Sequence, residues 1–215
     1  MTKALELLKQ TGAILTDSHF VGTSGKHFAT YINKDALYPH TVETSEVCKM
    51  MAEKVKELEI EAVVGPSVGG IILSQWIAFH LSEIKGKEVL GVYTEKDANG
   101  YQIFKRGYDK IVSGKKVIIV EDLTTTGGSA KKVVETAKAA GAEVVGAVVM
   151  VNKNPAQVTS EFFGVPFYYL DVLEVSVYEE SDCPLCKAGV PIDIRVGHGK
   201  KYLESKAKFN LEEIL

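Results

Sequence analysis

Residues 116–131 read KVIIVEDLTTTGGSAK, and this stretch decides both the fold class and the candidate site. Its run of β-branched apolar residues, 117–120, predicts a strand buried on both faces. Two carboxylates, Glu121 and Asp122, follow at the strand end, and a turn rich in hydroxyl groups and glycine comes next. A helix is expected to begin near Ser129, so the stretch predicts a strand, a ligand-binding turn and a helix in direct succession.

The turn has the composition of a phosphate site. Free N–H groups at a helix start attract phosphate together with the helix dipole, glycines let the backbone curl around it, and hydroxyl groups donate further hydrogen bonds. The residues expected to hold phosphate are Thr125, Thr126, Gly127, Gly128 and Ser129. Glu121 and Asp122 are expected to accept hydrogen bonds from the vicinal hydroxyls of a sugar, because ligands of open α/β sheets bind at strand ends.

Three other interpretations fit the residues of this turn less well. It lacks the Gly-Lys-Ser/Thr of a Walker A loop and the Gly-x-Gly-x-x-Gly of a dinucleotide site. A plain connecting turn with a serine N-cap accounts poorly for so many hydroxyl groups and glycines directly after two acids. A phosphate-binding turn is therefore favoured.

Apolar strand patterns and helical patterns alternate on both sides of this stretch. This alternation predicts an α/β fold with a doubly wound parallel sheet. The expected strands are 62–65, 89–93, 116–120, 144–151 and 167–172, and the expected helices include 44–58, 70–81, 128–140 and a last one near 205–215. Residues 94–107 are polar and contain Asn99-Gly100, which predicts a mobile excursion from the sheet.

Composition excludes several classes of protein. The chain has 215 residues, enough for one α/β domain, and its net charge of -3 provides no basic field for nucleic acid or an anionic membrane. No apolar run approaches the roughly 20 residues that span a bilayer, and residues 1–12 predict a short amphipathic helix rather than a signal peptide. We therefore expect a cytoplasmic protein that binds neither nucleic acid nor membrane.

Cys183 and Cys186 form a single C-x-x-C pair. Zinc normally needs four ligands, and the other candidates considered, Cys48 and His198, are distant in the sequence. A reduced pair in a surface turn is therefore the favoured interpretation, and no protein residue is assigned as a metal ligand.

The strand, the acidic pair and the Thr-Thr-Gly-Gly-Ser turn resemble the phosphoribosyl-pyrophosphate signature of type I phosphoribosyltransferases. Other segments resemble the orotate branch of that family over nearly the whole chain. They are the amino-terminal segments 11–13, 19–21 and 24–27, the loop 65–70, the end of a mobile loop at 104–108, and the tail segments 178–180 and 183–186. The resemblance implies one phosphoribosyltransferase domain over 1–215, with a small hood from about 1–40 and 175–215.

The resemblance also implies an activity, which is transfer of ribose 5-phosphate from 5-phosphoribosyl 1-pyrophosphate to orotate in pyrimidine nucleotide biosynthesis. Mg²⁺ is expected to bind mainly through the substrate, and a homodimer is implied. The resemblance implies catalytic roles for Asp122, Lys96 and Arg106. Of these, Lys96 and Arg106 would close over the departing pyrophosphate. Pyrophosphate contacts fall to Ser67, Val68, Gly69 and Gly70, and contacts on the base side fall to His27, Tyr31, Ile32 and Lys153.

Two alternatives stay open at this stage. One is a phosphoribosyltransferase for a purine base, although such an enzyme would not need the amino-terminal hood. The other is a non-catalytic regulator that senses phosphoribosyl pyrophosphate with the same turn. A regulator of that kind usually carries a basic face or an added DNA-binding domain, and neither is evident in a chain of net charge -3.

Overall fold

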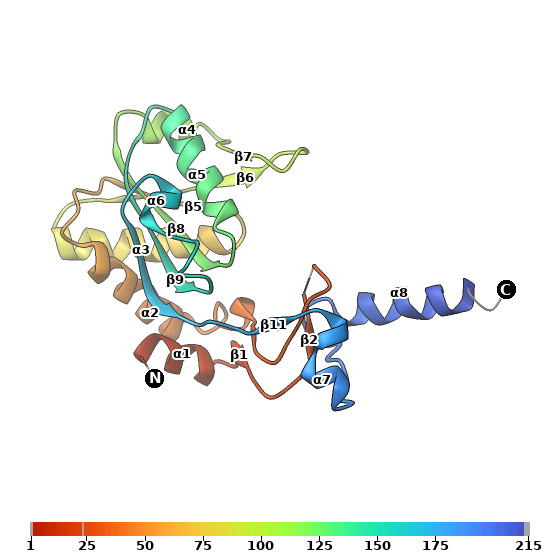
Figure 1. The fold of residues 1–215 in the computed structure, drawn as a ribbon. Coiled ribbons are helices and arrows are strands. Elements are labelled where there is room, and N and C mark those ends of the chain that lie inside the picture. The colour runs from red at the N-terminus through yellow and green to blue at the C-terminus, as the bar shows by residue number, and fades with distance from the viewer. Residues whose placement is uncertain (1, 23, 213–215) are drawn as a thin grey trace. The chain divides into compact units, whose positions relative to one another are not determined.

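The computed structural model describes residues 2–22 and 24–212, and the chain divides into two compact units (Figure 1). The first unit comprises Met1–Leu7 and Leu37–Glu174, and the second comprises Leu8–Ala36 and Val175–Leu215. That the second unit is the hood of a single phosphoribosyltransferase domain stays a prediction.

A six-stranded sheet forms the centre of the first unit. Its strand order is β10-β9-β8-β5-β6-β7, and every pairing is parallel except that of β6 with β7. The strands are β5 (Ala62–Pro66), β6 (Leu90–Lys96), β7 (Gln102–Ile103), β8 (Lys116–Thr124), β9 (Glu143–Asn152) and β10 (Phe167–Val172). The predicted α/β fold with a parallel sheet is confirmed.

Helices alternate with the strands of the central sheet, as predicted, and others precede the sheet in the chain. They are α1 (Lys3–Gln10, which runs across the boundary between the units), α2 (Thr41–Val55), α3 (Gly69–Lys85), α4 (Tyr108–Val112), α5 (Gly128–Ala139) and α6 (Ser160–Phe163). Helix α2 begins at Thr41, three residues before the predicted start at Thr44. The prediction missed these residues because Thr41 and Val42 are exposed and lie outside the apolar face that defined the helix. Helix α3 continues beyond the predicted end to Lys85, where Gly86 ends it at a φ of 63°.

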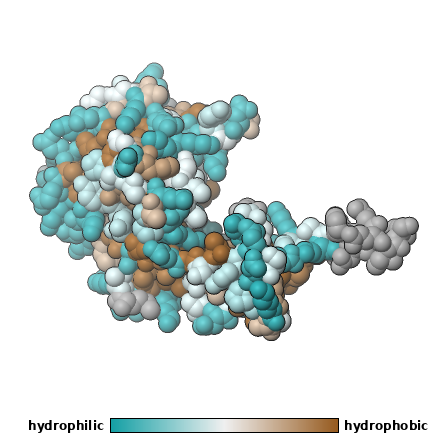
Figure 2. All heavy atoms as spheres, in the orientation of Figure 1, coloured by the Kyte–Doolittle hydropathy of each residue, from teal (hydrophilic) through white to brown (hydrophobic). Residues whose placement is uncertain are grey.

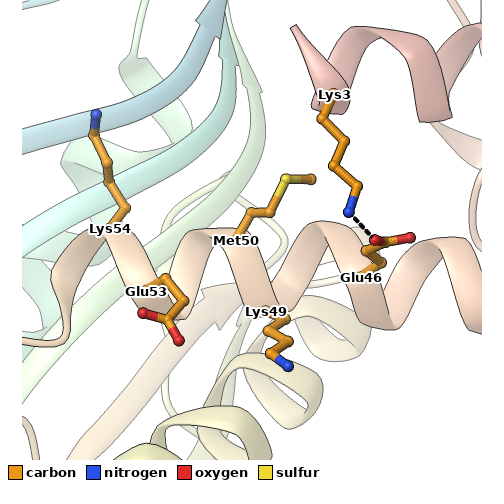
Figure 3. Close-up of a pocket in the computed structure, with 6 residues that line it drawn as sticks. All are labelled: Lys3, Glu46, Lys49, Met50, Glu53 and Lys54. Atoms are coloured by element: carbon orange, nitrogen blue, oxygen red, sulfur yellow. Dashed lines mark ion pairs between the residues drawn. The ribbon is translucent and has the colours of Figure 1, made fainter.

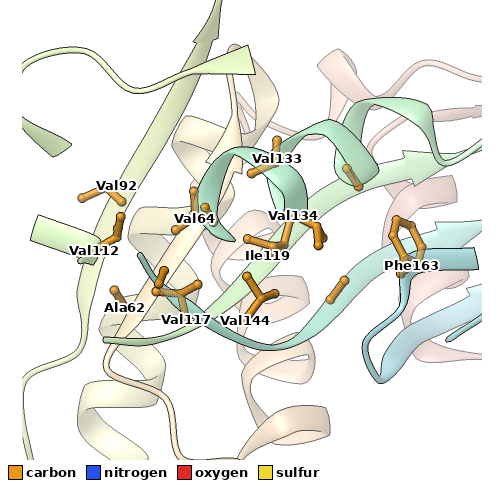
Figure 4. Close-up of a cluster of buried hydrophobic side chains, with 14 of the residues drawn as sticks. Ala62, Val64, Val92, Val112, Val117, Ile119, Val133, Val134, Val144 and Phe163 are labelled. Carbon is orange, nitrogen blue, oxygen red and sulfur yellow. The ribbon is translucent and has the colours of Figure 1, made fainter. Parts of the chain in front are cut away.

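Buried aliphatic side chains pack between α5 and one face of the sheet (Figure 4). Val117 and Ile119 of β8 face Val133 and Val134 of α5 across this core, and all four are at most 1% exposed. Burying one such side chain fully stabilises the fold by about 1.5–3 kcal/mol. This core holds the start of α5 at the end of β8.

Residues 94–107 form a β-hairpin of β6 and β7. Oδ1 of Asp97 accepts hydrogen bonds from the backbone of Asn99 and Tyr101 in its turn. Its backbone is tied to α5, because Thr136 Oγ1 donates to the carbonyl of Gln102 at 2.8 Å. The excursion is therefore a paired hairpin whose backbone contacts α5, and its mobility stays a prediction.

The second unit joins an early and a late part of the chain. One small sheet pairs β1 (Ile14–Leu15) with β4 (Tyr31–Ile32), and the other has the antiparallel order β11-β3-β2. Its other elements are β2 (Phe20–Val21), β3 (His27–Phe28), η1 (Lys34–Ala36), β11 (Val177–Tyr178), η2 (Glu180–Asp182), α7 (Pro184–Lys187) and α8 (Gly199–Glu212). Helix α8 therefore begins before the predicted 205, and residues 213–215 lie outside the described part.

The surface of the first unit in the view of Figure 2 is mainly hydrophilic, with hydrophobic side chains in smaller areas. Within residues 2–22 and 24–212, no helix combines the length and the apolar character needed to cross a membrane.

Candidate functional site

The connection from β8 to α5 encloses a pocket of about 190 Å³. Its lining is Glu121, Leu123, Thr124, Thr125, Thr126, Gly127, Gly128, Ser129 and Ala130. The five residues predicted to hold phosphate thus all line one cavity at the start of a helix. The N-cap of α5 is Gly127, which has no side chain to cap the helix, and the N–H of Gly128 makes only a long hydrogen bond of 3.5 Å to Thr126 Oγ1. The first turn can therefore offer its N–H groups to an anion.

Gly127 is required by the geometry of this turn. Its φ is +71°, and a Cβ placed on it would lie 2.6 Å from Cε1 of Phe162. Both the backbone conformation and the lack of space exclude a side chain here.

Asn152, at the end of β9, contacts Thr124, which lines the pocket. Its Oδ1 accepts a hydrogen bond of 3.1 Å from Thr124 Oγ1, and its Nδ2 donates to the carbonyl of Val158 at 3.0 Å. Both side chains are buried. Sequence analysis missed Asn152; its only signal was a polar residue at the end of a buried strand.

Glu121 and Asp122 are consecutive residues of β8, so their side chains leave the sheet on opposite faces. Glu121 lines the pocket, on the face of Val117 and Ile119. Asp122 turns to the other face, where Oδ2 accepts a hydrogen bond of 2.8 Å from the hydroxyl of Tyr38 and Oδ1 accepts one of 2.7 Å from the backbone of Leu123. The predicted pair of ribose contacts is therefore split between two environments.

Tyr38 is a second residue that sequence analysis missed. Burial, and then the neighbouring carboxylate of Asp122, raise the pKa of Tyr38 far above its ordinary value. The hydroxyl therefore stays protonated and acts as a hydrogen-bond donor.

The predicted pyrophosphate loop connects β5 to α3. The backbones of Gly65 and Gly70 approach so closely that a Cβ on Gly65 would lie 2.3 Å from the Gly70 carbonyl oxygen. Between them, the Ser67–Val68 peptide is cis and Val68 is 77% exposed. The N-cap of α3, Val68, makes no capping hydrogen bond with its side chain, and the starts of α3 and α5 both lie at strand ends of the same sheet.

The predicted catalytic cations Lys96 and Arg106 both belong to the β6–β7 hairpin and its continuation. Arg106 makes an ion pair with Glu95 and lies 5.6 Å from the centre of the Tyr93 ring. Lys105 pairs with the same carboxylate at 3.2 Å. Arg106 is thus held by a carboxylate of its own hairpin in this conformation.

Lys153 follows the end of β9, and its backbone N–H donates to the carbonyl of Thr124 at 2.8 Å. Its side chain is partly buried, and this burial lowers the pKa of Lys153 below the ordinary value of a lysine. Its ammonium has no hydrogen bond or ion pair within the described residues. A cation of this kind beside a phosphate pocket is available to an anionic substrate.

Tyr31, Ile32 and His27, the other residues predicted on the base side, belong to the second unit. Tyr31 and Ile32 form β4, and His27 is completely buried in β3. Burial, and then the neighbouring His19, lower the pKa of His27. The roles of these three residues toward a base stay predictions.

The prediction of a cysteine pair in a surface turn is wrong for Cys183, which is completely buried. His19 and His27 lie beside Cys183 and Cys186, whereas sequence analysis considered Cys48 and His198 as the further candidates. The pairing of β3 with β11 brings these distant segments together, and a local pattern does not show that pairing.

A larger depression of about 490 Å³ lies on α2, away from the strand ends (Figure 3). Its lining mixes both charges and is made of Lys3, Glu46, Lys49, Met50, Glu53 and Lys54. Lys3 and Glu46 already neutralise each other in an ion pair. The lining has no turn of glycine and hydroxyl residues to hold a phosphate, so the β8–α5 pocket is the candidate site.

Comparison with known proteins agrees with this geometry. Residues 33–164 match the family model of the phosphoribosyl transferase domain. The orotate phosphoribosyltransferase of Thermotoga maritima is 37% identical over 196 residues, which are 91% of this chain and 98% of that protein. The enzyme of the same name from Caldanaerobacter subterraneus is 34% identical over 190 residues, covering 88% and 94%.

A solved structure shows the same fold. The crystal structure of orotate phosphoribosyltransferase from Aeropyrum pernix superposes with a TM-score of 0.63 at 25% identity, over 80% of this chain and 94% of that one. Together with the strand, acidic pair and glycine turn around the pocket, these matches show that the chain belongs to the phosphoribosyltransferase family.

Proposed function

We propose that the protein transfers ribose 5-phosphate from 5-phosphoribosyl 1-pyrophosphate to orotate, giving orotidine 5'-phosphate and pyrophosphate. The observation that carries the proposal is the pocket between β8 and α5, with hydroxyl groups, glycines and helix N–H groups on one side and Glu121 on the other. The orotate phosphoribosyltransferases among its relatives support orotate as the base.

In this reaction the bond from the sugar C1 to the pyrophosphate oxygen breaks, a bond from C1 to a ring nitrogen of orotate forms, and that nitrogen releases its proton. The transition state resembles an oxocarbenium ion, so the protein contributes position and electrostatics rather than a covalent intermediate. We assign the 5-phosphate to residues 125–129 and the ribose hydroxyls to Glu121, with Asp122 supporting them. We assign binding of the pyrophosphate to residues 67–70 at the start of α3.

The residues present fit Mg²⁺ bound mainly through the substrate. Mg²⁺ prefers hard oxygen ligands, and the pocket offers the carboxylate of Glu121 and threonine hydroxyls. Glu121 lines the pocket, whereas Asp122 turns to the other face of the sheet, so Glu121 is the better placed protein ligand. The ion would offset the negative charge of the departing pyrophosphate.

We assign closure over the leaving group to the β6–β7 hairpin. Arg106 would exchange its carboxylate partner, Glu95, for pyrophosphate oxygens, which its planar fork can bind at two points. Lys96 adds a second cation. On the base side, Lys153 would pair with the carboxylate of orotate, while Tyr31 and Ile32 offer an aromatic and an apolar surface. These roles, a homodimer and a cytoplasmic location are parts of the proposal.

A panel of bases tests the proposal. Purified protein is given 5-phosphoribosyl 1-pyrophosphate and Mg²⁺ with orotate, uracil, hypoxanthine, xanthine or adenine, and nucleotide formation is followed by chromatography. We expect turnover with orotate, with Gly127→Val as the blocked-pocket control. Turnover with hypoxanthine or xanthine instead would make the protein a purine enzyme. Tight donor binding without transfer to any base would favour the sensing regulator.

A further inference from the structure

Four side chains with metal-binding atoms meet in the second unit, outside the pocket described above. They are His19, His27, Cys183 and Cys186. One ligand atom from each lies within 4.8 Å of all the others. Nε2 of His19 is 3.7 Å from Sγ of Cys183 and 3.8 Å from Sγ of Cys186, and Nδ1 of His27 is 3.3 Å from Sγ of Cys186.

These separations match a tetrahedral metal centre. Zinc bonds of about 2.0–2.1 Å to nitrogen and about 2.3 Å to sulfur give ligand-to-ligand separations of roughly 3.3–3.8 Å. The two histidine nitrogens are closer, at 2.7 Å, because they share a hydrogen bond. Opening that pair by about 0.6 Å, to the separation of two zinc-bound nitrogens, makes room for the ion.

The local backbone presents the four groups to one another. His27 pairs with Val21 of β2 and with Tyr178 of β11, and this sheet joins the histidine segment to the cysteine segment. Pro184 begins α7 directly after Cys183, and the Lys187 N–H donates to the Cys183 carbonyl at 3.1 Å, so both cysteines lie on one tight turn.

The second ring nitrogen of His19 also has a partner. Nδ1 lies 2.8 Å from the carbonyl oxygen of Val190, which accepts and therefore fixes the proton on Nδ1. Nε2 then presents its lone pair to the cluster. Metal-bound histidines characteristically donate their other N–H to a carbonyl in this way.

Burial indicates a structural site rather than a catalytic one. His19 is 1% exposed, and His27 and Cys183 are 0% exposed. Four protein ligands fill the coordination shell of zinc and leave no position for water or substrate. Two thiolates and two neutral imidazoles balance the charge of the ion when both thiols release their protons, so the complex can be buried as a neutral unit.

We propose that His19, His27, Cys183 and Cys186 form a structural Zn²⁺ site. The unit that contains it has few buried apolar side chains among its described residues: Leu8, Ala13, Phe20, Val21, Phe28 and Ile32. Small units of this kind are commonly held by a metal, because their cores are too small. Cys183 and His19 are 164 positions apart, so the ion would cross-link two remote parts of the chain.

The test is the metal content of the full-length protein, produced without a polyhistidine tag in zinc-supplemented medium and measured by plasma mass spectrometry. We expect stoichiometric zinc in the wild type and trace zinc in Cys186→Ser and His19→Gln. Two control variants should keep it: Cys48→Ser, which removes a buried cysteine of the first unit, and His198→Gln, which removes a histidine of the second unit outside the cluster.

Cobalt distinguishes loss of a ligand from loss of the fold. After a chelator has removed the zinc, added Co²⁺ should give thiolate charge-transfer and tetrahedral visible bands in the wild type and in both controls. The chelator should also lower the Tm of the wild type. Zinc-free wild-type protein that takes up no cobalt, or variants that keep full zinc, would overturn the proposal. So would a Cys183–Cys186 disulfide in protein prepared under reducing conditions with excess zinc.

Discussion

The hydroxyl of Tyr38 donates a 2.8 Å hydrogen bond to Oδ2 of Asp122, directly beside Gly69. A Cβ on Gly69 would lie 2.3 Å from that carboxylate oxygen and 2.5 Å from that hydroxyl. This contact joins the segment between η1 and α2, the end of β8 and the start of α3. It therefore fixes the ribose side of the proposed site relative to its pyrophosphate side.

Tyr38→Phe should destabilise the protein by about 1–3 kcal/mol, because a buried carboxylate oxygen loses its donor. It should also weaken binding of the donor substrate, since the start of α3 loses a fixed neighbour. Urea unfolding and calorimetric titration measure the two effects. Tyr101→Phe is the control, because Tyr101 is 62% exposed. Wild-type values for Tyr38→Phe in both experiments would show that the contact does not organise the site.

Glu121→Gln and Asp122→Asn should behave differently, because only Glu121 lines the pocket. Loss of the charge at Glu121 should weaken donor binding by about 1.5–3 kcal/mol while the stability changes little. Asp122→Asn should lower both, because the amide replaces an acceptor of two hydrogen bonds in a buried position. Calorimetry with 5-phosphoribosyl 1-pyrophosphate, paired with thermal unfolding, separates these patterns. Identical patterns for the two variants would contradict the assignment.

Gly127→Ala should cost about 1–3 kcal/mol of stability and abolish phosphate binding, because the methyl group meets Phe162 and the positive φ is strained. Gly164→Ala is a matched control. Gly164 has a φ of +66° but no atom within 4 Å of its Cβ position, so it reports the backbone strain alone. Equal effects of the two substitutions on ribose 5-phosphate binding would refute a phosphate role for the turn.

Arg106→Ala should lower the single-turnover rate by about 100-fold while donor affinity changes little, since closure acts in the transition state. Lys105→Ala should do less, because a flexible ammonium is more easily replaced. Glu95→Gln should raise the rate by at most about fivefold, because an exposed ion pair contributes about 0–1 kcal/mol. An unchanged rate for Arg106→Ala would mean that the hairpin is not the catalytic lid.

The lowered pKa of Lys153 predicts that the KM for orotate depends on pH. Since burial lowers the pKa of Lys153, its charge is lost at a lower pH than that of an ordinary lysine. The KM for orotate should therefore rise as the pH passes through this lowered pKa, and Lys153→Arg should remove the rise because arginine stays charged. The exposed Lys138→Met is the control and should keep the wild-type profile. A flat wild-type profile would exclude Lys153 as the partner of the base.

The same pKa has a consequence for stability. In the pH range between the lowered pKa of folded Lys153 and the ordinary lysine value, the unfolded chain binds more protons. Stability should therefore rise with pH across that range in the wild type, and Lys153→Met should remove this increment. Urea unfolding at several pH values measures it, and a parallel pH dependence of the two proteins would contradict the burial argument.

Local patterns sufficed for the elements around the pocket. The run from Val117 to Val120 predicted its strand, and the adjoining acids, hydroxyl groups and glycines predicted the turn, because each feature reflects the backbone within a few residues. Whether Glu121 or Asp122 enters the pocket was not predictable in the same way. That choice depends on which face of β8 carries α5, and this is a property of the assembled sheet.

The residues that sequence analysis missed act through distant partners. Tyr38 contacts a residue 84 positions away, and Asn152 contacts one 28 positions away. The histidines beside the C-x-x-C pair were missed for the same reason, although two histidines and two cysteines are the residue types that a zinc site uses.

The division of the second unit between both ends of the chain also sets an order of synthesis. Strand β3 finds its partner β11 at residues 177–178, after every strand of the six-stranded sheet has been made. The segment Leu8–Ala36 therefore lacks its late partner strand during synthesis, whereas residues 37–174 can already fold as a contiguous block. A released chain that ends at residue 174 should protect the central sheet from protease and leave the early segment open to cleavage.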